Sequence, residues 1–308
     1  MKRLFLILSL IACSWVSLAQ DESQADFLRR YDNLVERVGP AGLGVETLLN
    51  KWEAAYPEDA QQMLARFSFF FTRCQSSRVV ELPQERYLGK APLLPFTDSL
   101  GVKHNYFEVV DYDDDLFAEA LLSIDKALKV KPWRLDYRMV KADALIAYEK
   151  ESPEMALVEL KSLADKHFKE HPVWEVEGMD GVSDEQFNAF MQDYCAALFR
   201  LGTPTSAEAF KSLAEHLLTY EKDNPLFLND LGSYYLVKKE YKKAQKYYDQ
   251  VLRKHPSDMT ALKNSILMAR SLKDSKLEKK YLTLMAKNGE TETDRASAQA
   301  RLDAFARK

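Results

Sequence analysis

The sequence lacks the short motifs that mark most enzyme active sites. It contains no GxSxG nucleophile turn, no glycine-rich loop of the kind that cradles phosphate, and no dinucleotide-binding fingerprint. Scattered serine, histidine and aspartate residues can still meet in space, so a hydrolase or metal enzyme on a helical scaffold stays as a third hypothesis. The first expectation is a protein that is not an enzyme and that needs no cofactor.

Long apolar runs are scarce as well. One lies at the N-terminus, from Leu4 to Val16, after the basic start Met1–Arg3 and before the small-residue site Ser17–Ala19. This pattern is typical of a secretory signal peptide, whose apolar core is too short to span a bilayer. No later segment approaches the roughly 20 apolar residues that a spanning helix needs. We predict a signal peptide over residues 1–19 and an exported mature chain, periplasmic or secreted, that begins at Gln20.

A bacterial lipoprotein signal is the alternative. Leu10–Cys13 resembles a lipobox in which Cys13 carries the lipid, although Trp15 and Val16 continue the apolar run past it. Under this hypothesis the protein is a lipid-anchored structural subunit of an envelope assembly.

Basic residues are not in excess. The chain has 43 lysines and arginines against 47 acidic residues, and cleavage would remove Lys2 and Arg3, leaving a net charge of about −6. This balance gives no electrostatic reason to expect a nucleic-acid partner. One local group of lysines is interpreted as a solvated face, because lysine is mostly exposed. These residues are Lys238, Lys239, Lys242, Lys243 and Lys246.

Cysteine is rare, with three residues in the whole chain. Only Cys74 and Cys195 remain after cleavage. An exported compartment permits a disulfide, but the two residues lie in segments that we place two repeats apart. Solenoid repeats contact mainly their neighbours. We therefore expect two buried free thiols.

The most regular pattern lies in Pro225–Ser257, where two amphipathic helices follow each other with small residues at their closest crossings. The residues at helical spacing are Leu228, Leu231, Gly232 and Tyr235, then Ala244, Tyr248, Val251 and Leu252, with Pro256 at the end. Amphipathic helices lie on both sides of each of four X-Pro pairs, and proline separates helices because it lacks the amide hydrogen. These pairs are Lys131-Pro132, His171-Pro172, Asn224-Pro225 and His255-Pro256. A polar capping helix is expected over about 294–307.

One segment, about 75–115, interrupts this array. It separates a predicted helix, Ala60–Cys74, from the next helix, which begins near Leu116, and it is far longer than an ordinary loop. Val79–Leu82 and Tyr106–Val110 favour strands. We expect a small extended or hairpin element laid against the helices. It is either a binding element or a structural cover for the groove.

Two polar clusters have both a metal-binding and a structural interpretation. An acidic cluster just before Leu116 lacks the glycine and distal glutamate of an EF-hand loop, and we interpret it as a helix cap. His167 and His171 have the spacing of two zinc ligands on one helix, but no third ligand is evident. We expect no metal site at either cluster. The residues of the acidic cluster are Asp111, Asp113, Asp114 and Asp115.

The stretch 225–258 resembles the tetratricopeptide repeat (TPR), a 34-residue helix pair that mediates protein interactions. The resemblance is good over 116–172 and extends weakly over most of the chain. It implies an all-α fold, a right-handed α-α superhelix (a TPR-like solenoid) over 20–308 with one insert, extended or containing a β-hairpin. Ala19-Gln20 is similar to the signal-peptide ends of exported Bacteroidota TPR proteins. The insert is similar to a subgroup of them without an assigned function.

In TPR proteins the first helices line a concave groove that takes a peptide or another protein's surface. The resemblance therefore implies a non-enzymatic protein- or peptide-binding scaffold of the cell envelope. Lys263 and Asn264 fit the carboxylate clamp of one TPR subclass, whereas Asp230 and Ser233 depart from it. The implied groove residues are Asn229, Asp230, Ser233, Leu236, Lys263, Asn264, Leu267 and Arg270.

Overall fold

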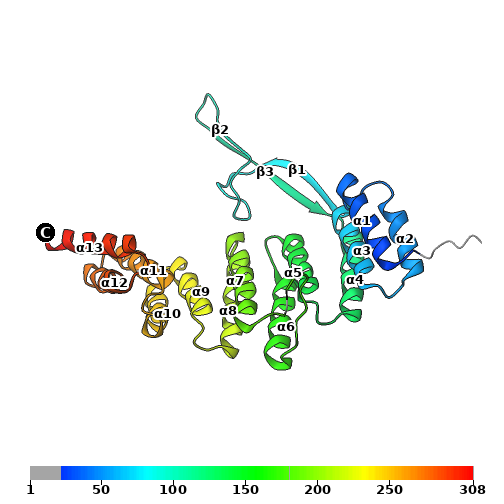
Figure 1. Ribbon diagram of the computed structural model, residues 1–308. Helices are drawn as coiled ribbons and strands as arrows, with labels where there is room; N and C mark the ends of the chain where they lie inside the picture. The colour runs from blue at the N-terminus through cyan, green and yellow to red at the C-terminus, as the bar shows by residue number, and fades with distance from the viewer. Residues whose placement is uncertain (1–21, 180, 308) are drawn as a thin grey trace, which may run out of the picture.

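The computed structural model describes residues 22–179 and 181–307, and helices follow one another along nearly all of it (Figure 1). The predicted signal peptide, residues 1–19, and Cys13 lie outside the described residues. Helices of the described residues are α1 (Gln24–Val38), α2 (Val45–Ala55), α3 (Ala60–Arg73), α4 (Asp114–Val130), α5 (Leu135–Glu149), α6 (Glu154–Glu170), α7 (Asp184–Leu201), α8 (Pro204–Tyr220), α9 (Pro225–Val237), α10 (Tyr241–Lys254), α11 (Met259–Ser271), α12 (Ser275–Asn288) and α13 (Glu292–Ala306).

Neighbouring helices pack in pairs and the pairs form a row (Figure 1). The pairs are α3 with α4, α5 with α6, α7 with α8, α9 with α10 and α11 with α12. Each later pair also packs against the next, α8 against α9 and α10 against α11. The chain is therefore an all-α, TPR-like solenoid with one small insert, which confirms the predicted fold class.

Proline and capping side chains set the helix boundaries. Pro204 and Pro225 lie in the first turns of α8 and α9, where a missing amide hydrogen costs no helical hydrogen bond. Thr203 and Asn224 precede them and accept hydrogen bonds from backbone amides of the first turn. These prolines and capping side chains therefore fix the residues at which α8 and α9 begin.

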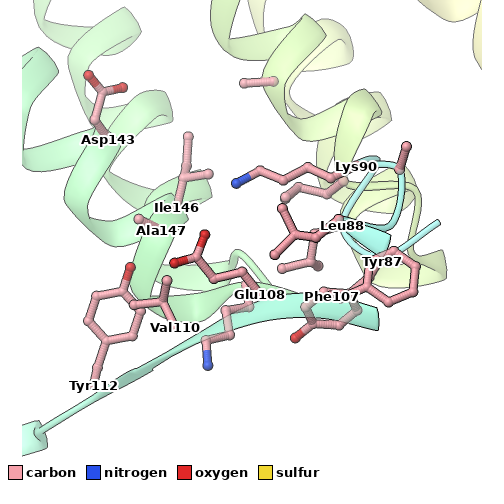
Figure 2. A pocket seen from close by; sticks show the side chains of 15 residues that line it. Tyr87, Leu88, Lys90, Phe107, Glu108, Val110, Tyr112, Asp143, Ile146 and Ala147 are labelled. Atoms are coloured by element: carbon pink, nitrogen blue, oxygen red, sulfur yellow. The ribbon is translucent and has the colours of Figure 1, made fainter. Parts of the chain in front are cut away.

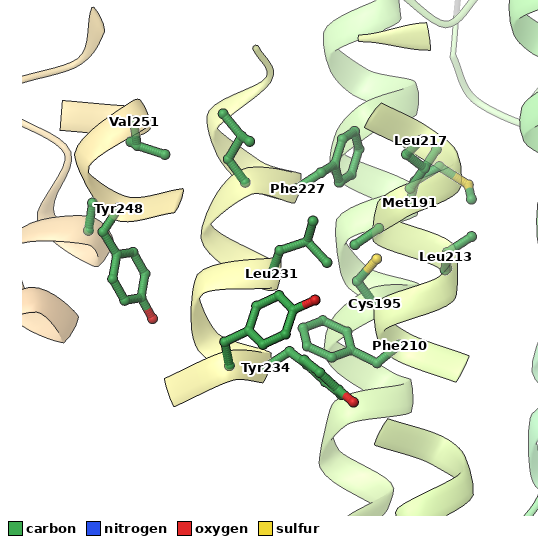
Figure 3. Packing of buried hydrophobic residues seen from close by; sticks show 14 of the residues in the cluster. Met191, Cys195, Phe210, Leu213, Leu217, Phe227, Leu231, Tyr234, Tyr248 and Val251 are labelled. Atoms are coloured by element: carbon green, nitrogen blue, oxygen red, sulfur yellow. The ribbon is translucent and has the colours of Figure 1, made fainter. Parts of the chain in front are cut away.

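The core runs along the row rather than gathering in one centre. Figure 3 shows Phe210 of α8 beside Cys195 of α7, with Leu231 and Tyr234 of α9 against them. Cys74 and Cys195 are buried free thiols, as expected, and burial raises the pKa of Cys74 to about 11. Two further buried clusters lie towards the N-terminus, one centred on α3 to α5 and one on α1 to α3.

In the repeat 225–258, α9 crosses α10 at Gly232. A Cβ atom at this position would lie 2.4 Å from Cε1 of the Tyr248 ring. Tyr248 is fully buried, and its hydroxyl lies 3.3 Å from Oγ of Ser233. Because Gly232 has no side chain, the ring can lie directly against the α9 backbone.

The insert between α3 and α4 forms a three-stranded antiparallel sheet rather than a single hairpin. Its strands are β1 (Gln75–Glu81), β2 (Leu94–Thr97) and β3 (Lys103–Tyr112), in the order β1-β3-β2. Gln75 pairs with Tyr112, and the Asp113 amide donates to the Cys74 carbonyl at 2.8 Å. The ribbon therefore starts where α3 ends and α4 begins, and it reaches over the row (Figure 1).

Only part of the acidic cluster before α4 acts as a cap. The Asp113 carboxylate accepts from the Leu116 amide at 2.9 Å, and Asp114 and Asp115 lie in the first turn. Asp111 lies on β3 instead, where Arg78 donates to it at 2.5 Å. The expectation that all four residues cap the helix was wrong for Asp111, because the strand continues to Tyr112.

Replacing Gly232 with alanine will test the close crossing of α9 and α10. The new methyl group must displace the Tyr248 ring, and such overpacking costs about 1–3 kcal/mol, offset by up to about 1 kcal/mol of helix propensity. We expect G232A to lower the free energy of unfolding in urea by about 1–2 kcal/mol. Adding Tyr248→Leu removes the clash, so the double variant will lose less than the sum of the single variants. If the stability losses of the two single variants add up to that of the double variant, the close contact between Gly232 and the Tyr248 ring is contradicted.

Candidate functional site

The insert contacts one face of the helical row. This face is formed by the first helices of successive pairs, and insert residues share a cavity with side chains of α5 and α7. In Figure 1 the sheet lies on the side of the row where α5 and α7 have their C-terminal ends. The cavity therefore has one wall from the repeats and one from the insert.

A tight turn, Tyr87–Lys90, holds the insert against α7. Tyr87 and Lys90 exchange two backbone hydrogen bonds of 3.0 Å, and Leu88 and Gly89 between them have φ values of +47° and +75°. Two positive φ values are those of a type I′ turn, which favours glycine. A Cβ atom on Gly89 would lie 1.9 Å from the Arg200 carbonyl oxygen at the end of α7. Only glycine allows this approach.

The cavity beneath the turn has a volume of about 320 Å³ and a mostly apolar lining. Leu88 comes from the turn, Val110 from β3, and Ile146 and Ala147 from α5 (Figure 2). Leu201 of α7 also lines the cavity. Its size and lining are in the range of pockets that bind small molecules or peptide side chains.

Charged side chains interrupt this apolar lining. Figure 2 shows the Lys90 ammonium reaching from the turn towards α5, and the Glu108 carboxylate reaching up from β3. Asp143 lies one turn along α5 from Ile146. Protein atoms around Asp143 displace water and raise the pKa of its carboxyl, an effect that the Tyr194 hydroxyl reduces.

An ion-pair network fixes the opposite end of the cavity. Asp111 of β3 pairs with Arg78 of β1 and lies 3.5 Å from Nζ of Lys150, the residue that follows α5. The same ammonium lies 5.6 Å from the centre of the Tyr112 ring. Arg78 lowers the pKa of Asp111, so the carboxylate stays charged. The base of the insert is thereby attached to α5.

The predicted groove residues of α9 are largely engaged inside the fold. Asn229 and Asp230 are buried, and Nδ2 of Asn229 donates to Asp258 at 3.1 Å. Nε2 of Gln192 donates to Oδ1 of Asp230 at 2.9 Å, while Oδ2 of Asp230 makes no hydrogen bond within the described residues. Both side chains join neighbouring helices.

Ser233 and Asn264 also contact each other across the row. Nδ2 of Asn264 donates to Oγ of Ser233 at 3.4 Å, beside the Tyr248 hydroxyl. Leu236 is half-buried and packs against the main core. The contact between Ser233 and Asn264 connects α9 to α11, so these two polar side chains are partly engaged within the fold.

The predicted residues of α11 are the more accessible ones. Leu267 is 54% exposed, and it lines a hollow of about 250 Å³ with Lys263 and Arg270. Lys263 lies 3.4 Å from Asp294 of α13, and Arg270 donates to Glu278 of α12 at 2.8 Å. The structure thus brings three of the predicted residues together beside the C-terminal helix, and their role in binding stays a prediction.

The two histidines do not converge. His167 is buried, stacks on Phe187 at 3.7 Å between ring centres, and accepts at Nδ1 from Nε1 of Trp174 at 3.0 Å. His171 is exposed and ends α6 in the left-handed conformation. Over residues 22–179 and 181–307 there is no group of three side chains suited to a metal ion.

The sequence pointed to the insert but not to the residues that line its cavity. Lys90, Glu108 and Asp143 belong to segments without a recognisable motif, and only the fold brings them together. The one local signal was Leu88-Gly89, since glycine in a short polar loop marks a tight turn.

Comparisons with known proteins give little further guidance. No family model matches the chain, and no curated protein matches it. Among solved structures it is similar to pilF of Pseudomonas aeruginosa, at 12% sequence identity and a TM-score of 0.36, over 92% of this chain and 99% of that chain. A likeness of this size carries no functional argument. Among the helices of the described residues, none combines the length and apolar character needed to cross a membrane.

Stability near neutral pH will depend on Asp230. Burial raises the pKa of this carboxyl to about 7, whereas an aspartate in the unfolded chain titrates near 3.9. The folded state therefore holds the proton more tightly, and the free energy of unfolding falls as pH rises from about 4 to about 7. Asp230→Asn keeps an acceptor for Gln192 without the charge. We expect this variant to lose less stability than wild type between about pH 5 and about pH 8.

Urea unfolding at both pH values measures the effect, with Asp193→Asn as the control, because Asp193 lies exposed on α7. Equal pH dependence in Asp230→Asn and wild type would show that Asp230 is charged in the folded protein throughout this range.

Proposed function

We propose that the chain is a non-enzymatic scaffold that binds a protein or peptide segment on the face formed by α5, α7, α9 and α11. The observation that carries this proposal is the cavity of about 320 Å³ built jointly by the insert and the first helices α5 and α7. A stack of helix pairs leaves an extended face, and an apolar hollow with a few charged groups is the usual form of a binding pocket.

The binding face extends beyond this cavity. At its other end, Lys263, Leu267 and Arg270 line the hollow beside α13. An extended segment has the shape to lie along such a row, with one side chain in the insert cavity and others over α9 and α11. In this proposal the insert selects the partner, while the repeats supply length.

We also propose that the protein acts in the cell envelope after export. The basic start, the apolar run and Ala19 support cleavage before Gln20. In the alternative, Cys13 is lipidated and the scaffold is an anchored subunit of an envelope assembly. Mass spectrometry of the mature protein separates the two, with an unmodified start at Gln20 expected. A lipid-modified Cys13 at the mature N-terminus would establish the alternative.

Peptide binding will depend on the contact between the Tyr87–Lys90 turn and α7. Alanine at Gly89 must both adopt φ +75° and move away from the Arg200 carbonyl. Gly101→Ala is the matched control, because Gly101 has φ +83° but no atom within 4 Å of its Cβ position. The probes are peptides selected on wild type from a random displayed library. We expect Gly89→Ala to raise their Kd about tenfold, a loss of about 1.4 kcal/mol, and Gly101→Ala to leave it nearly unchanged.

Lys263→Glu tests the far end of the face, where Lys263 is exposed. Some selected peptides will lose affinity in this variant as well. Two results would contradict the proposed function: a library that yields no saturable binder, or binders that are insensitive to both Gly89→Ala and Lys263→Glu.

A further inference from the structure

We propose that the cavity beneath the insert binds a basic side chain, lysine or arginine, of a peptide in which apolar residues flank it. This inference rests on the proposed function and names the chemistry of its partner. Its basis is the distribution of unpaired charges within the insert and on the α5 wall.

Nearly every charged side chain of residues 75–112, all of which the structure describes, has a partner within the protein. Glu85 pairs with Lys103 at 2.7 Å, and His104 lies between Glu81 and Asp98, at 2.6 and 3.3 Å. Arg78 pairs with Asp111, and Arg86 donates to the Gly89 carbonyl at 2.9 Å. The two exceptions are Lys90 and Glu108, and both line the cavity.

Lys90 and Glu108 do not pair with each other. Both reach into the same space from different sides, one from the turn and one from β3 (Figure 2). Asp143, on the α5 wall, also makes no ion pair within the described residues. Among the described residues, the cavity therefore has two carboxylates and one ammonium that make no ion pair, while its other lining ammonium, Lys150, lies 3.5 Å from Asp111.

This set of charges favours a ligand with a cationic group and a neighbouring acceptor. A guanidinium or ammonium beside Glu108 makes a charge-assisted hydrogen bond, which is stronger than a neutral one. Lys90 then donates to a backbone carbonyl of the same peptide. An acidic side chain would face both carboxylates, and the net charge of −4 on the whole chain also attracts cations over longer distances.

The apolar lining fits the stem of a basic side chain. Lysine and arginine bury three or four methylene groups along apolar surface while the charged end stays hydrated or paired. Val110, Ile146 and Leu88 provide such a surface below the charged groups. A volume of about 320 Å³ exceeds that of one stem, so it also admits part of a flanking apolar residue.

The test uses three labelled pentapeptides that differ only in the central residue between two leucines: arginine, its uncharged isostere citrulline, and glutamate. Fluorescence anisotropy gives their Kd for wild type, for Glu108→Gln and for Glu85→Gln. Glu85 is an exposed insert carboxylate that already pairs with Lys103, so its variant is the matched control.

We expect wild type to bind the arginine peptide at least about tenfold more tightly than the citrulline peptide, and the glutamate peptide to bind most weakly. Glu108→Gln will reduce the preference for arginine to less than about threefold, whereas Glu85→Gln will retain it. Because the Glu108 side chain is exposed to solvent, Glu108→Gln will keep the thermal stability of wild type.

Equal binding of the arginine and citrulline peptides, or an unchanged preference in Glu108→Gln, would overturn the inference. Competition by free arginine at the same affinity as the peptide would show that the site recognises the amino acid and not a peptide. If library-selected peptides without basic residues bind in a manner sensitive to Gly89→Ala, the proposed function stands and this inference fails.

Discussion

The packing of α3 against α4 is the interaction on which the insert and its cavity depend. These helices are separated by about 40 residues in sequence, yet they form a repeat-like pair, with Phe67 of α3 and Ile124 of α4 in one buried cluster. Their packing brings the two ends of the insert together, so the chain between them must leave and return side by side. An antiparallel ribbon that begins with the pair Gln75 and Tyr112 is the direct result. Alternate residues of β3, such as Phe107 and Val109, are buried, and the turn that follows β1 contacts α7.

The helices were predictable because their signals are local. Proline before α9, small residues such as Gly232 at the crossing, and apolar residues at helical spacing each act over a few positions, and together they fix a helix pair. The sheet was harder to predict. Its central strand, β3, pairs with β1 across 25 or more residues, and strand order depends on contacts that no short window of sequence contains. The sequence therefore indicated strands but not that the last one lies in the middle.

The candidate site was only partly predictable. The sequence predicted an insert over about 75–115, and strands β1 to β3 lie between Gln75 and Tyr112, but the residues that line the cavity come from a turn, a strand and two helices that the fold assembles. On α9, register alone placed Asn229 and Asp230 on the groove side. In the structure these side chains bridge α9 to its neighbours, because polar groups near a helix crossing are stabilised by partners across it. A repeat template gives the direction of a side chain but not whether a neighbouring helix already binds it.

The division of the core into clusters determines where the cavity lies. Helix α5 contributes Tyr137 and Leu145 to the cluster of α3 and α4, and Leu135 and Ala142 to the long cluster that continues to α13. The insert is attached to the first of these clusters, whereas α7, which the Gly89 turn touches, belongs to the second. The cavity therefore lies where the two clusters adjoin, and α5, which contributes residues to both clusters, forms one of its walls.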